Sequence, residues 1–166
     1  MDVQPGVAIF VDFIVALILI FSFIGGLKEG AVKEFFSLIA LIIALPLAGF
    51  FYGYLSSWLT FMQDSDWRNI IAFLLMTGII TVILIFIFIL PRHLLDKIWS
   101  GGCIWSIAGG LIGLVNSAVG LVVLVTLVEA NPNAGWARDI TLASNILNWL
   151  ISNLNPVVQL LPEALR

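Results

Sequence analysis

Long apolar runs alternate with short polar stretches along most of this chain. Four runs cover residues 7–24, 35–54, 70–90 and 104–128. Each approaches or exceeds the roughly 20 residues that a helix needs to cross a bilayer. Because backbone groups inside lipid must pair within their own segment, the four runs predict transmembrane helices. We expect Pro91 to end the third helix, since proline lacks the backbone N–H that the helical ladder uses.

Composition supports a membrane location. The chain has 166 residues, of which 61% are hydrophobic and 10% charged. Soluble domains carry roughly 25% charged residues, so water could not solvate so apolar a chain. The net charge of −3 and the lack of a Lys/Arg cluster exclude nucleic acid as an expected partner. The sequence therefore predicts an all-α integral membrane protein whose surroundings are the lipid bilayer.

A turn-rich break follows the fourth run at residues 130–135. Beyond it, residues 136–154 repeat apolar positions at helical spacing and predict one amphipathic helix. Its expected apolar face consists of Trp136, Ile140, Ala143, Leu147, Leu150, Ile151 and Leu154. We thus divide the chain into a transmembrane domain, 1–130, and a C-terminal amphipathic segment, 131–166, lying in the membrane interface or against the bundle.

Basic residues near the span ends suggest an orientation. The first and third connections carry four basic residues, Lys28, Lys33, Arg92 and Lys97. The opposite side carries three, Arg68, Arg138 and Arg166. Since cytoplasmic connections are enriched in Lys and Arg, we expect both termini outside the cell membrane.

Small residues gather on one face of the fourth span, within an arc of about 100°. They are Gly102, Ser106, Gly109, Gly110, Gly113, Ser117 and Gly120. In lipid such residues let two helix backbones approach closely. The favoured interpretation is tight packing inside one subunit; the alternative is a subunit interface, with self-association or another membrane protein as partner, or a pore-lining helix. Asn116 borders this face and could hydrogen-bond across it.

Asp12 is the one charge inside the predicted spans. Intramembrane acids are costly and often functional, so a proton or cation site is one interpretation. The favoured alternative is that the span begins at Asp12, whose side chain caps the helix.

The stretch GGLKEGAVKEFF, residues 25–36, resembles neither a phosphate loop nor a catalytic cluster. It predicts a hinge between two spans, in which Gly25, Gly26 and Gly30 permit the reversal. Glu34 then lies in the first turn of the second span, where the helix dipole favours an acid. A lone His93 and the lack of metal or triad spacing predict no enzyme, catalytic residue, cofactor or metal.

Asp12, then seventeen residues, then Gly30-x-x-Lys33-Glu34, resembles the colicin V production protein family. The resemblance extends to the four-span layout, the pair Gly109-x-x-x-Gly113 and the amphipathic tail. It implies a bacterial inner-membrane protein linked to colicin V production or export and to envelope homeostasis. Positions singled out as functional or packing candidates are Asp12, Gly26, Gly30, Lys33, Glu34, Gly109, Gly113, Asn116 and Ser117.

The family often has an Asp-Arg pair before the glycine pair and an Arg inside it. Here those places read Trp105-Ser106 and Asn116. The favoured function is a membrane accessory or scaffold protein. The alternative is a small oligomeric channel or transporter, resembling the membrane part of small mechanosensitive channels. Thr77, Thr81, Asn116 and Thr126 supply little polarity for a pore, which favours the scaffold.

Overall fold

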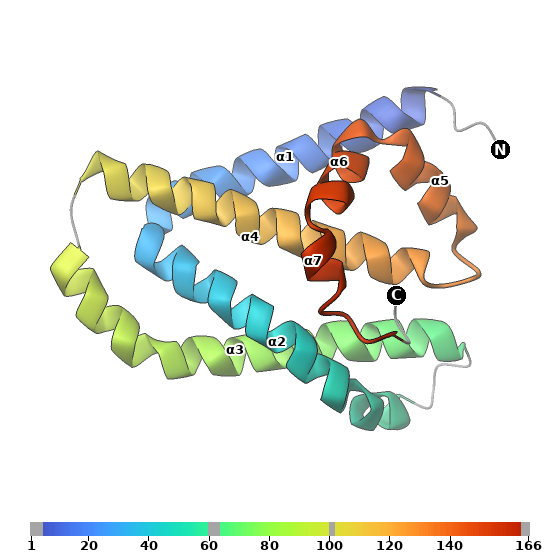
Figure 1. The fold of residues 1–166 in the computed structure, drawn as a ribbon, viewed down its shortest axis with the longest axis horizontal. Helices are drawn as coiled ribbons and strands as arrows, with labels where there is room; N and C mark the ends of the chain where they lie inside the picture. The colour runs from blue at the N-terminus through green and yellow to red at the C-terminus, as the bar shows by residue number, and fades with distance from the viewer. Residues whose placement is uncertain (1–4, 60–63, 100–101, 164–166) are drawn as a thin grey trace.

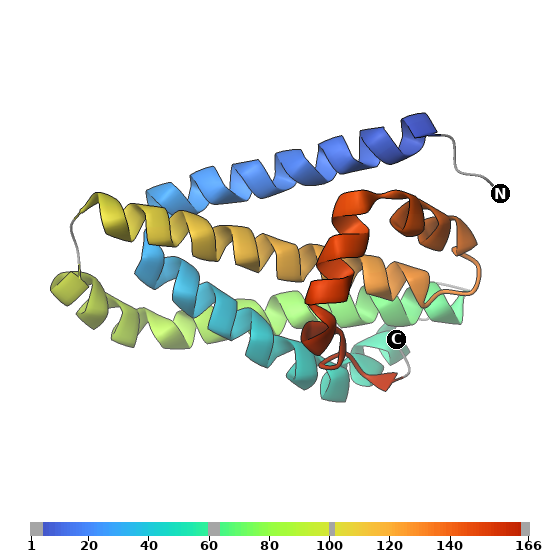
Figure 2. The ribbon, with the colours of Figure 1, turned by 45° about the horizontal axis from the view of Figure 1, so that its top comes forward.

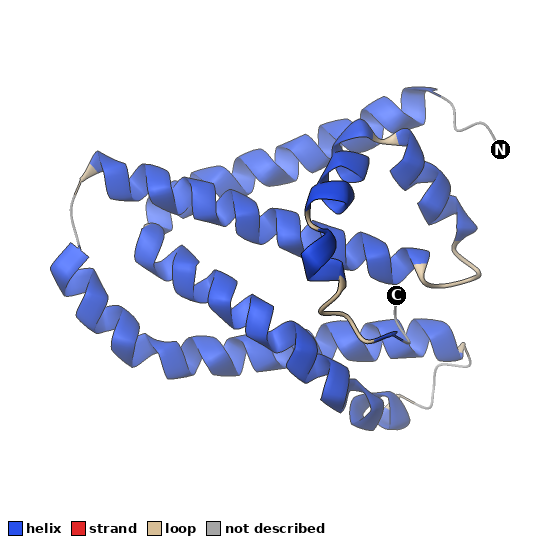
Figure 3. Ribbon diagram, viewed as in Figure 1, coloured by secondary structure: helices blue, strands red, loops and turns tan. Residues whose placement is uncertain are grey.

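The computed structural model describes residues 5–59, 64–99 and 102–163 (Figure 1). These residues are helical almost throughout and contain no strand (Figure 3). The long helices are α1 Pro5–Glu29, α2 Ala31–Trp58, α3 Ser65–Trp99 and α4 Cys103–Glu129. Each contains a stretch long and apolar enough to cross a membrane. The prediction of an all-α protein with four membrane-spanning helices is therefore confirmed.

The four long helices run up and down in turn and pack as two pairs. Helix α1 lies beside α4, and α2 lies beside α3, while α4 also contacts α2 (Figures 1 and 2). Leu45 of α2, Phe73 of α3 and Leu127 of α4 are fully buried in the core between these helices. On the other side of α4, Val122 packs with Val15 of α1. Helix α4 is thus the central helix of the described structure.

Large apolar side chains cover the outside of the bundle. On α1, Ile9, Phe10 and Phe21 are each more than 60% exposed, and Phe86 on α3 is exposed to a similar degree. A protein in water rarely presents so much contiguous apolar surface. In a bilayer the same side chains meet lipid tails, so the exterior agrees with the four-span prediction.

The expectation that Pro91 ends the third helix is wrong. Helix α3 continues through Pro91 to Trp99, and its ribbon curves in this C-terminal part (Figure 1). A proline inside a helix removes one hydrogen bond and bends the axis, and membrane helices often tolerate that loss. The third helix is therefore longer than its apolar run.

The C-terminal segment is three short helices, not the single amphipathic helix predicted. They are α5 Gly135–Ala143, α6 Asn145–Asn153 and α7 Asn155–Val158. The break falls at Ser144, whose backbone is extended. The three helices fold back against α4 (Figure 2). Helices α5 and α6 also contact α1. The segment thus packs against the bundle.

The predicted apolar face of this segment is right for α6 and wrong for α5. Leu147 and Leu150 of α6 are buried against α1 and α4, but Trp136 of α5 is 58% exposed. Thr141, expected on the polar face, is buried and donates its hydroxyl hydrogen to the carbonyl of Ala137 at 2.9 Å. The break at Ser144 changes the direction of the chain, so the face that packs inward in α6 does not continue through α5.

Candidate functional site

The reversal between α1 and α2 takes a single residue. Helix α1 ends at Glu29 and α2 begins at Ala31, so Gly30 alone lies between them. Its φ of +84° is a conformation that residues with a side chain rarely adopt. Gly25 and Gly26 lie inside α1, so the expectation that all three glycines permit the reversal is wrong for these two. The hinge is Gly30.

Gly26 instead belongs to a backbone crossing between α1 and α4, which we call the glycine crossing and define by Gly26, Gly109 and Gly113. A Cβ atom on Gly26 would overlap the carbonyl group of Gly109, and one on Gly109 would overlap that of Gly26. A Cβ atom on Gly113 would lie 2.8 Å from the backbone oxygen of Ser22. The two helices therefore touch through their backbones, as small residues permit in lipid.

The glycine crossing bears on the two interpretations of the small-residue face. Gly109 and Gly113 contact α1 of the same chain, which is the tight packing inside one subunit that the sequence favoured. Gly120, two turns further along α4, has no atom within 4 Å of the place where its Cβ would be. The small-residue face is thus covered at Gly109 and Gly113 and open at Gly120.

A hydrogen bond fixes the end of α1 beside this crossing. The hydroxyl of Ser106 on α4 donates to the backbone oxygen of Leu27 at 2.7 Å. Carbonyl groups in the last turn of a helix lack a partner four residues on. Because Gly30 turns the chain, a side chain from α4 supplies the missing donor for Leu27.

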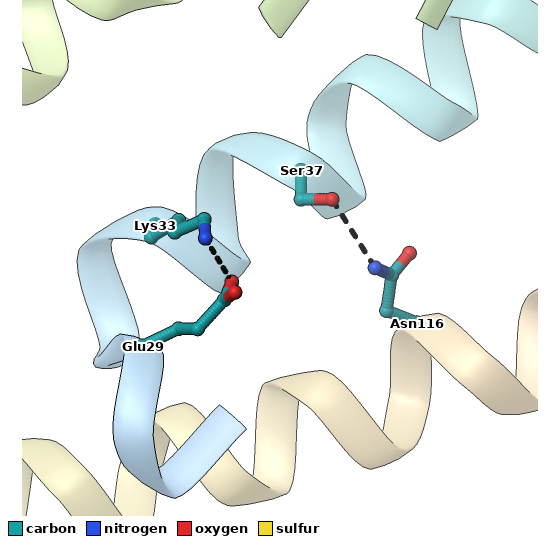
Figure 4. Close-up of polar contacts among 4 residues, drawn as sticks. All are labelled: Glu29, Lys33, Ser37 and Asn116. Atoms are coloured by element: carbon teal, nitrogen blue, oxygen red, sulfur yellow. Dashed lines mark hydrogen bonds and ion pairs between the residues drawn. The ribbon is translucent and has the colours of Figure 1, made fainter. Parts of the chain in front are cut away.

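Polar side chains of three helices meet next to the glycine crossing. Lys33 of α2 forms an ion pair with Glu29 of α1, with Nζ and Oε2 2.5 Å apart. The amide nitrogen of Asn116 on α4 donates to the hydroxyl of Ser37 on α2 at 3.3 Å (Figure 4). The Oδ1 atom of Asn116 is buried and accepts no hydrogen bond from the described residues. The predicted hydrogen bond from Asn116 across the helix face therefore exists, and it reaches α2.

A cavity of about 380 Å³ lies at this meeting point. Its lining residues are Ser22, Gly25, Gly26, Glu29, Glu34, Leu41, Gly113, Asn116 and Ser117. Glu34 occupies the first turn of α2, as predicted, where the positive end of the helix dipole stabilises a carboxylate. Glu34 forms no ion pair with any described lysine or arginine side chain. The cavity is thus polar and acidic although the surrounding helices are apolar.

Asp12 lies elsewhere and does not cap its own helix. Helix α1 is already helical from Pro5, so the favoured interpretation of Asp12 as the start of the span is wrong. Its Oδ1 atom accepts hydrogen bonds from the hydroxyl of Ser144 at 2.5 Å and from the backbone N–H of Ile146 at 3.2 Å. The Ser144 hydroxyl oxygen in turn accepts from the N–H of Leu147 at 3.2 Å. Asp12 therefore caps α6 from a neighbouring helix.

The structure brings eight of the nine candidate positions together, and Asp12 is the exception. Gly26 lies fourteen positions after Asp12, which is about 21 Å along a helix that rises 1.5 Å per residue. The spacing of Asp12 from Gly30-x-x-Lys33-Glu34 is thus not a spatial pairing. Sequence reasoning missed Ser22, Ser37 and the cap at Ser144. The cap at Ser144 could have been predicted, because a serine directly before an apolar helical repeat is typical of a helix start.

These features define the class of the protein: a four-span α-helical membrane protein whose first and fourth spans cross through glycines beside an acidic cavity. Residues 11–155 match the family described as Colicin V production protein. The chain belongs to the colicin V production protein family. It is similar to the "Colicin V production protein homolog" of Haemophilus influenzae, with 26% identity over 150 residues that cover 87% of this chain and 91% of the relative. No solved structure gives a significant match to the chain.

Proposed function

We propose that this protein acts in colicin V production or export and in envelope homeostasis, as an accessory or scaffold protein of the bacterial inner membrane. The observation that carries the proposal is the division between a packed inside and an apolar outside. The glycine crossing holds α1 against α4, while Phe10, Phe13 and Phe21 of α1 point away from the bundle. A fixed helix with large outward side chains is suited to contact lipid and other membrane helices.

The contact surface for a further helix is proposed on the open part of the small-residue face of α4. Gly120 leaves space above its backbone, and Leu124, one turn on, is exposed. A second copy of this chain or another membrane protein would pack there. In this proposal both termini lie on the side of the membrane away from the cytoplasm, as the distribution of basic residues suggests.

Replacement of the resident family member in a colicin V-producing bacterium tests the role. Cells that lack the family member receive this chain or an empty vector, and the colicin V activity released into the medium is measured. The proposal expects this chain to restore release. Equal release with chain and empty vector, at matched membrane levels of the protein, would count against the role.

A small oligomeric channel or transporter is the second candidate, favoured by polar groups inside the helices. Besides the acidic cavity, the hydroxyls of Thr77 and Thr81 on α3 are buried and have no hydrogen-bond partner among the described residues. A channel would use such groups to replace the hydration of an ion. Ion flux through liposomes that contain the purified protein tests this candidate. Flux in liposomes that contain the wild-type chain, and none in protein-free liposomes, would support it; membranes that stay tight with the wild-type chain would exclude it.

A further inference from the structure

The acidic cavity combines oxygen atoms from three helices with open space. Ser22 comes from α1, Glu34 from α2, and Asn116 and Ser117 from α4. Carboxylate, amide and hydroxyl oxygens are the donors that hard cations prefer. At about 380 Å³ the cavity has room for an ion and several water molecules.

The Glu34 side chain interacts with Asn116 and Glu29 but has no ion-pair partner among the described basic side chains. Glu29 is neutralised by Lys33 at 2.5 Å. Glu34 also lines the cavity and forms no ion pair with the described basic side chains. A carboxylate between apolar helices needs a cation or a proton nearby, because burial of an unpaired charge is costly. One positive charge in this cavity would therefore balance the Glu34 carboxylate.

Glycine keeps the approach to this carboxylate open. A Cβ atom on Gly113 would lie 3.5 Å from the carboxyl carbon of Glu34, and Gly25 and Gly26 line the same cavity without side chains. Asn116 also lines the cavity, and its amide nitrogen donates a hydrogen bond to the hydroxyl of Ser37. A cation in this cavity would satisfy the Glu34 carboxylate.

We propose that this cavity is a binding site for a monovalent alkali-metal cation. The Glu34 carboxylate neutralises the ion, and the hydroxyl oxygens of Ser22 and Ser117 replace part of its hydration shell. A divalent ion would leave one positive charge uncompensated, because Glu29 is already paired with Lys33. The site does not depend on the proposed role in colicin V production, and its test uses the purified protein alone.

The test measures binding of radioactive sodium and rubidium, the latter in place of potassium, to the full-length chain in lipid nanodiscs, with choline chloride holding the ionic strength constant. The wild-type chain is expected to bind at least one of the two ions saturably. Glu34→Gln is expected to weaken this binding about tenfold or more, since the site loses its charged ligand. Glu163→Gln, which changes an exposed glutamate far along the chain, is expected to bind as wild type does.

A second variant separates loss of the site from loss of the fold. Asn116→Arg places a guanidinium beside Glu34, and we expect it to abolish cation binding while thermal unfolding of the purified protein occurs at the same temperature or higher. Absence of saturable binding to the wild-type chain would overturn the proposal. So would wild-type binding by Glu34→Gln, or displacement of the bound ion by magnesium at lower concentrations than by sodium and potassium.

Discussion

Gly26 of α1 and Gly109 of α4 lie backbone against backbone, and neither position has room for a Cβ atom. The two residues are far apart in sequence, and their contact fixes the first span to the last. Gly113 extends the contact by one turn of α4, next to the backbone of Ser22. The acidic cavity lies directly beside this crossing, so the packing of the glycines and the geometry of the cavity depend on each other.

Gly109→Ala is expected to destabilise the protein, because the added methyl group would overlap the carbonyl of Gly26 and force the helices apart. Overpacking of this kind costs about 1–3 kcal/mol. The matched control is Gly78→Ala in α3, where no described atom beyond the adjoining backbone of α3 lies within 4 Å of the new Cβ. There the higher helix propensity of alanine predicts no loss, and a gain of up to about 1 kcal/mol. Thermal unfolding in detergent measures both variants, and equal melting temperatures would contradict the crossing.

Removal of the Asp12 carboxylate is expected to loosen the C-terminal helices without unfolding the bundle. Asp12→Ala takes away the acceptor for the Ser144 hydroxyl and the Ile146 N–H. Loss of a helix cap costs about 1 kcal/mol. Hydrogen exchange of the backbone amides of α6 should therefore become faster, while exchange in α4 stays as in wild type. Asp139→Ala serves as a control, and identical exchange of α6 in both variants would rule out the cap.

The ion pair between Lys33 and Glu29 is expected to contribute little to stability. Their side chains are 36% and 43% exposed, and exposed ion pairs are worth about 0.2–1 kcal/mol. Lys33→Met should therefore leave the melting temperature in detergent nearly unchanged. A large drop would show that the pair is structural. If Lys33→Met is stable and inserted in the membrane but cells that carry it release less colicin V, the hinge itself takes part in function.

A bulky side chain at Gly120 is expected to weaken association without damaging the fold. Gly120→Leu fills the open part of the small-residue face, where no described atom beyond the adjoining backbone of α4 lies within 4 Å of the new Cβ. Photobleaching steps of fluorescently labelled protein in lipid count the copies in each complex. We expect fewer copies for Gly120→Leu than for Gly53→Leu, which adds the same side chain at an equally open site on α2. Equal counts would place the contact elsewhere.

The four spans could be predicted from sequence because the lipid requirement acts on every residue in a run. The close approach at Gly109 and Gly113 could also be predicted, since spacing along one helix shows a small-residue face. Which helix fills that face could not, because any of the other three spans offered a surface. The sequence assigned Gly26 to a turn, whereas α1 continues to Glu29 and Gly26 lies inside it.

Features that depend on distant partners lay beyond the sequence. Asp12 and Ser144 are 132 residues apart, and no local pattern joins an acid in the first span to a cap near the C-terminus. The cavity likewise requires α1, α2 and α4 to meet before Glu34 and Asn116 share a space. Pro91 was wrongly predicted to end the third helix, because its local effect on a helix is unfavourable. The rest of the helix compensates for this effect.

The most direct test of the account is the colicin V activity released by cells whose family member is replaced by Gly26→Leu or by Gly78→Leu. Both variants add the same side chain to a transmembrane helix, but only the first separates α1 from α4. We expect that Gly26→Leu abolishes release and Gly78→Leu restores it, with both proteins present in the membrane. If both variants restored release equally, the glycine crossing between α1 and α4 would not be required for function.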